Sequence, residues 1–90
     1  MVRRDLEFET DGPDRLESAV SRLGLEAVRH VLKTQPNAVH WHITKPPGKG
    51  TLEATWNPAS QEFWLAVRSN RTAGWQNAVL DDLIESIRNQ

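Results

Sequence analysis

The sequence predicts an α+β fold: a two-layer α/β sandwich of order β-α-β-β-β-α, in which two helices cover one face of a mainly antiparallel four-stranded sheet. Residues 16–32 and 75–88 repeat apolar side chains at the three- and four-residue spacing of amphipathic helices. Residues 39–44, 51–56 and 62–68 alternate apolar and polar side chains, which is typical of half-buried strands. A chain of 90 residues is enough for one core, so residues 1–90 are expected to form a single domain.

The first strand is expected over residues 4–10, where Leu6 and Phe8 alternate with acidic side chains. Residues 11–14 then end the strand and begin a helix, because Pro13 suits a first helical turn, where its missing N–H has no partner to lose. If this strand lies beside the next one, the connection between them is a right-handed crossover.

A helix of about six turns is expected next, judging from the length of its apolar stripe. The stripe consists of Leu16, Val20, Leu23, Ala27 and Val31. Gly24 interrupts it: glycine costs about 1 kcal/mol relative to alanine inside a helix, yet it is the preferred residue just past a helix end. One bent helix and two shorter helices both fit the pattern. We expect one helix, with His30 at its boundary beside Arg29.

The segment TKPPGKGTLEATW, residues 44–56, contains glycines and a lysine in the manner of a phosphate-binding loop. Such a loop needs the spacing GxxxxGK[ST] between a strand and a helix. Here the earlier glycine is missing, and the following residues alternate as a strand does. We therefore expect a turn centred between Pro47 and Gly48, with a second turn at residues 57–60.

This turn position predicts one register for three strands, with Ile43 opposite Leu52 and Leu52 opposite Val67. All the apolar positions of the strands then share one face: Val39, Trp41, Ile43, Leu52, Ala54, Trp56, Phe63, Leu65 and Val67. The helices are expected to pack on this face, with Trp75 opening the final helix. Trp41→Ala or Trp56→Ala is expected to cost about 3–5 kcal/mol of stability.

The opposite face of the predicted sheet is expected to be open. Its side chains include Trp64, His40, His42, Glu53, Thr55 and Arg68. Exposed aromatic residues are enriched at binding surfaces, so we expect a non-enzymatic interaction module that forms a homodimer or binds another protein through this face. The alternative is that Trp64 lies flat under Arg68 or His40, or beneath the N-terminal segment, and has no binding role.

Two other functions fit the same face. The first is RNA binding. The order helix, three strands, helix resembles that of double-stranded-RNA-binding domains, and an aromatic, basic sheet face suits single-stranded RNA. The chain lacks, however, the cluster of lysines that binds phosphate in such domains. The second alternative is a small metal- or ligand-binding site, because His40, His42 and Glu53 supply the imidazole nitrogens and carboxylate oxygen that zinc prefers.

Composition limits the classes of function that the chain can have. The net charge of −1 falls short of the basic stripe of most nucleic-acid binders. No apolar run reaches the roughly 20 residues that cross a bilayer, and the start of the chain lacks the apolar stretch of a signal peptide, so a cytoplasmic protein without membrane contact is expected. There are no cysteines, and no serine lies in a GxSxG motif, so no catalytic residue and no cofactor are assigned.

Overall fold

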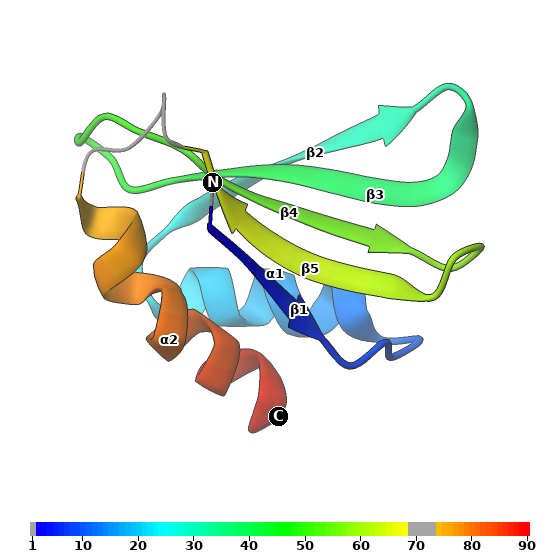
Figure 1. Cartoon of the computed structure of the whole chain (residues 1–90). Coiled ribbons are helices and arrows are strands. Elements are labelled where there is room, and N and C mark those ends of the chain that lie inside the picture. Colours follow the sequence, from blue (N-terminus) through cyan, green and yellow to red (C-terminus); the bar gives the residue numbers. More distant parts are fainter. Residues whose placement is uncertain (1, 69–73) are drawn as a thin grey trace.

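The structure is a computed structural model that describes residues 2–68 and 74–90 (Figure 1). Within these ranges it contains five strands and two helices. In chain order they are β1 (Val2–Leu6), α1 (Gly12–Arg22), β2 (Glu26–Leu32), β3 (Gln35–Thr44), β4 (Leu52–Asn57), β5 (Glu62–Val67) and α2 (Trp75–Arg88). The α+β class is confirmed, and so is the final helix. The expected four-stranded sheet is wrong, because the sheet has a fifth strand, β2.

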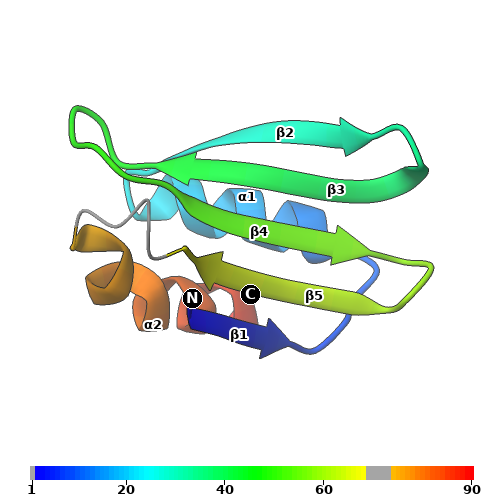
Figure 2. The same ribbon diagram turned by 45° about the horizontal axis from the view of Figure 1, so that its top comes forward.

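The strands form one antiparallel sheet in the spatial order β1-β5-β4-β3-β2. Both helices lie on the same side of this sheet (Figures 1 and 2). Within the described residues, the two layers therefore leave one sheet face without a covering helix, and this face is called the open face below. No helix in the described ranges is long and apolar enough to cross a lipid bilayer.

The predicted register of β3, β4 and β5 is confirmed. Ile43 lies opposite Leu52 and Val39 opposite Trp56 between β3 and β4. Between β4 and β5, Ala54 lies opposite Leu65 and Glu53 opposite Ala66. The segment between β3 and β4 is a turn, in which the N–H of Gly48 donates to the carbonyl of Lys45 at 2.8 Å. It joins two strands and precedes no helix.

The expected six-turn helix is wrong, because α1 ends at Arg22 and the chain turns at Gly24. Gly24 has a φ of +71°, in the left-handed region that favours glycine. Its N–H donates to the carbonyl of Ser21, and the N–H of Leu25 donates to that of Val20. These two bonds form the Schellman motif that closes helix ends. The chain then runs back as β2.

The first strand also differs from its expected position. It covers Val2–Leu6 instead of residues 4–10, and it pairs with β5, with Val2 opposite Val67. The condition for the right-handed crossover is therefore not met, because β1 lies beside β5 and not beside β3, which contains the expected next strand. Phe8 lies past the end of the strand and stacks on Trp56, with ring centroids 5.3 Å apart.

The core lies between the sheet and the two helices. Its largest fully buried residues include Trp41, Phe63, Leu16, Ile43, Leu52, Leu65 and Leu83. The indole of Trp41 donates to Glu17 of α1 at 2.9 Å, so the one polar atom of this buried side chain is satisfied. Trp56 and Trp75 are half-buried and pack against the same cluster. The apolar face predicted from alternation is thus the core face.

Candidate functional site

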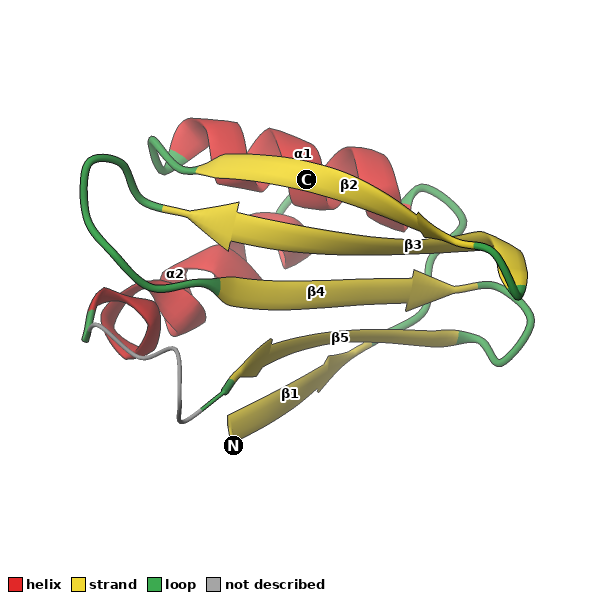
Figure 3. Ribbon diagram, turned by 90° about the horizontal axis from the view of Figure 1, so that it is seen from above, coloured by secondary structure: helices red, strands yellow, loops and turns green. Residues whose placement is uncertain are grey.

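The open face brings the predicted site residues together. Because side chains alternate along a strand, residues next to the buried Trp41, Ala54 and Leu65 point away from the helices. Cross-strand pairing then aligns His40 with Thr55 and Trp64 in one row, and His42 with Glu53 and Ala66 in the next. Figure 3 shows the order of the strands that carry these rows.

Glu53 is the centre of a polar cluster on this face. Its side chain is only 6 % exposed, although it extends from the open face. One carboxylate oxygen, Oε1, lies 3.0 Å from Nε2 of His40 and 3.9 Å from Nε2 of His42. The other oxygen, Oε2, accepts a short hydrogen bond from the guanidinium of Arg68. A buried carboxylate needs such partners, because burying an unpaired charge is costly.

His40 is held at both ring nitrogens. Its Nδ1 lies 2.8 Å from the hydroxyl of Thr55, and its Nε2 faces Glu53. A carboxylate can only accept, so Nε2–H donates to Glu53, and in the neutral ring Nδ1 then accepts from the hydroxyl of Thr55. The ring is 18 % exposed, whereas that of His42 is 37 % exposed and reaches solvent. The two rings are in edge contact, with centroids 5.1 Å apart.

Sequence reasoning placed His30 on a helix, which is wrong. His30 lies on β2, directly opposite His40, and its ring centroid is 4.5 Å from that of His42. Three histidines therefore lie side by side on the open face. The turn at Gly24 was the signal in the sequence that could have placed His30 here.

Trp64 is on the open face as predicted, but its ring is partly covered. The guanidinium carbon of Arg3 lies 4.6 Å from the ring centroid, in the geometry of a cation–π contact. Arg3 also binds Asp5 and Glu62, and these hydrogen bonds raise its pKa. A segment of the first strand thus covers Trp64, as the non-binding alternative anticipated, and Trp64 is half-buried.

The charges on the open face are balanced locally. Arg3 binds two carboxylates, and Arg68 binds Glu53. Both arginines are therefore paired with carboxylates on this face.

The outer edge of β2 borders the open face. No strand in the described ranges pairs with this edge, and Val28 and Val31 are 58 % and 67 % exposed. The opposite edge, β1, carries the charged residues Arg3, Arg4 and Asp5. Charged side chains discourage edge-to-edge pairing, so the two edges differ in how well they are protected.

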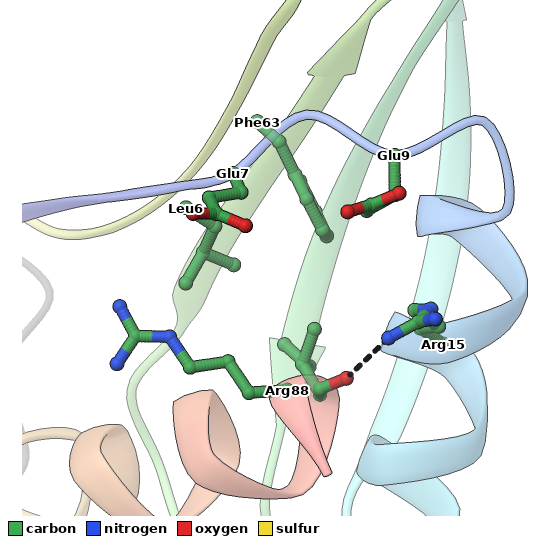
Figure 4. A pocket seen from close by; sticks show the side chains of 7 residues that line it. Leu6, Glu7, Glu9, Arg15, Phe63 and Arg88 are labelled. Carbon is green, nitrogen blue, oxygen red and sulfur yellow. Dashed lines mark hydrogen bonds between the residues drawn. The ribbon is translucent and has the colours of Figure 1, made fainter. Parts of the chain in front are cut away.

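A cavity of about 340 Å³ lies on the helix side of the sheet, and none of the residues of the polar cluster lines it (Figure 4). Leu6, Phe63 and Ile87 line its apolar part, and two acidic and two basic side chains surround them. Arg15 is held by Asp11 and reaches the carbonyl of Ile87 at 3.5 Å. The cavity thus lies where α2 ends against α1 and the segment after β1.

Comparison of the chain with protein-family models, with curated proteins and with solved structures found no match.

Proposed function

We propose that this protein is an interaction module that self-associates along the border of its open sheet face, through the outer edge of β2. The observation that carries the proposal is the exposure of Val28 and Val31 on β2, whose outer edge pairs with no strand among the described residues. An exposed strand edge presents backbone donors and acceptors that pair readily with a second strand. Trp64, the centre expected from the sequence, is less suited because Arg3 covers it.

The sequence of β2 favours one antiparallel register with a second copy. If Val28 faces its own counterpart on a two-fold axis, Glu26 lies opposite the partner's His30 and Ala27 opposite the partner's Arg29. The central pair is apolar, and the flanking acidic and imidazole side chains attract one another. Val31 then lies opposite the partner's Leu25, so both exposed valines gain an apolar neighbour.

This pairing would also bring the open faces of the two copies together. A two-fold axis perpendicular to the sheet keeps both open faces on the same side, because residues that pair share a face. Two copies therefore form one continuous antiparallel sheet whose open faces adjoin. The histidines of both copies lie close to the shared edge, since His30 lies on β2 itself.

Cysteine cross-linking tests the register directly, because the natural chain has no cysteine. In Val28→Cys, two thiols would meet on the axis, and Cα atoms of facing antiparallel residues are about 4.5–5.5 Å apart, within disulfide reach. We expect a covalent dimer under mild oxidation. The matched control is Val2→Cys, on the other edge strand, where valine is also exposed (46 %) and no cross-link is expected.

Sedimentation equilibrium provides the second test. The natural chain is expected to approach twice the 10.2 kDa chain mass as its concentration rises. Val28→Lys places two like charges opposite each other and should return the mass to that of one chain, whereas Val2→Lys should not. A natural chain that stays monomeric at millimolar concentration, or a Val2→Cys variant that cross-links as fast as Val28→Cys, contradicts the proposal.

A further inference from the structure

We propose that His40, His42 and Glu53 bind one divalent transition-metal ion of the zinc type on the open face of each chain. The ligand atoms are Nε2 of each histidine and Oε1 of the glutamate. The site lies within a single chain and does not depend on self-association. The polar cluster around Glu53 would thus be a metal-binding site.

The separations between the three ligand atoms are already close to those found around a bound ion. They all lie within 4.8 Å of one another, and the two measured separations from Oε1 are 3.0 Å and 3.9 Å. Ligand atoms that lie about 2.0–2.1 Å from a tetrahedral zinc ion are about 3.4 Å apart. Shifts of about 1 Å therefore suffice to reach this geometry. The partly exposed ring of His42 is well placed to make the largest of these shifts.

The donor set selects the class of ion. Two imidazole nitrogens and one carboxylate oxygen suit zinc and its first-row neighbours, whereas magnesium and calcium prefer oxygen ligands alone. Three protein ligands leave a fourth position for water or for a group from another molecule. The partial exposure of His42 keeps that position accessible to solvent.

Thr55 contacts the ring nitrogen of His40 that does not face the proposed ion. When His40 binds a metal through Nε2, its remaining proton moves to Nδ1, which then donates to the hydroxyl of Thr55 at the 2.8 Å separation already present. A hydroxyl can donate or accept, so Thr55 orients the ring both with and without the ion. Metal-binding histidines almost always have such a partner on the other nitrogen.

Arg68 occupies the other oxygen of Glu53 and leaves Oε1 to face the histidines. The guanidinium compensates the buried carboxylate when no metal is bound. An ion at Oε1 therefore replaces a proton between His40 and Glu53 without removing the partner that keeps Glu53 stable in its buried position.

Calorimetric titration of the purified chain with zinc chloride tests the proposal. We expect one ion per chain for the natural protein and for Val28→Lys, so this result stands apart from self-association. His42→Gln should abolish the binding, and because the His42 side chain is partly exposed, the substitution removes little buried packing. His30→Gln, which changes the neighbouring exposed histidine outside the ligand set, should bind as the natural chain does.

Two further measurements separate ligands from neighbours. Thr55→Val keeps all three ligands and should weaken zinc binding by about 10- to 100-fold. Cobalt(II) at the site should show the intense visible bands of a four-coordinate ion, and these bands should be missing in His42→Gln. No zinc binding at micromolar metal, or equal binding by His42→Gln and the natural chain, overturns the proposal.

Discussion

Gly24→Ala tests the turn that makes β2 a strand. In the structure, Gly24 has a φ of +71°, and a Cβ built there meets nothing within 4 Å. The cost of adding a methyl group is therefore one of backbone conformation, with no steric overlap to add to it. If the chain instead continued as the long helix that the apolar spacing favours, alanine would be the better residue at this position.

The two conformations predict opposite signs. A non-glycine residue in the left-handed region costs about 1–2 kcal/mol, so Gly24→Ala should lower the melting temperature by about 4–16 °C for a domain of this size. In a continuous helix, the same change would stabilise the protein by about 1 kcal/mol. Asparagine tolerates the left-handed region better than alanine, so Gly24→Asn should lie between the natural chain and Gly24→Ala.

Thermal unfolding followed by circular dichroism measures this order. We expect stability to fall from glycine to asparagine to alanine. A continuous helix would reverse it, with alanine the most stable and glycine the least. That reversed order would refute the assignment of residues 26–32 as an edge strand, and the proposed self-association would fail with it.

Two further substitutions test packing and electrostatics. Gly12→Ala should lower the free energy of unfolding by about 1–3 kcal/mol, because the added Cβ would lie 2.7 Å from the indole of Trp56, which is held by its hydrogen bond to the carbonyl of Glu9. This penalty should largely vanish in a Trp56→Leu background. Denaturant titration of the natural chain, the two single variants and the double variant measures it. The pKa of Glu17 is lowered by the hydrogen bond from Arg29 and, less strongly, by that from Trp41. Its stabilising effect is therefore present above its unfolded pKa and is lost as the pH falls through the lower folded pKa. Glu17→Gln should lower the free energy of unfolding by roughly 0.2–1 kcal/mol at neutral pH and leave it unchanged in acid, and an equal deficit at both pH values in urea titrations would contradict this cause.

The register of β3, β4 and β5 is predictable because these strands are buried on one face. Each apolar residue that turned outward would be exposed, so only one alignment buries Trp41, Ala54 and Leu65 together. The grouping of His40, His42 and Glu53 follows from the same register. This part of the site was therefore available from alternation alone.

The position of β2 could not be read in the same way. Val28 and Val31 are both exposed although they lie on opposite faces of the strand, so β2 shows no alternation of apolar and polar residues. Ala27 and Val31 instead continue the helical spacing that starts at Leu16. A single glycine was the only local signal against a long helix, and periodicity outweighed it.

The contact between Arg3 and Trp64 was beyond sequence reasoning for a different reason. It depends on the pairing of β1 with β5, which are the first and the last described strands along the chain. Periodicity describes how a segment faces its surroundings, but it does not say which distant segment lies beside it. Cover by the N-terminal segment was one of the alternatives for Trp64, and the structure was needed to choose among them and to move the proposed contact to β2.

The pairing of β1 with β5 also sets the order in which the sheet can be completed. Among the described strands, β1 comes first in the chain, yet its one neighbour in the sheet, β5, comes last. The hairpins from β2 to β5 join strands that are close in the sequence, and such pairings form faster than pairings between distant segments. We therefore expect β1 to pair with β5 last. Until β1 docks, the outer edge of β5 beside Trp64 stays uncovered, so the charged strand β1 replaces β5 as an edge of the sheet only when this last pairing forms.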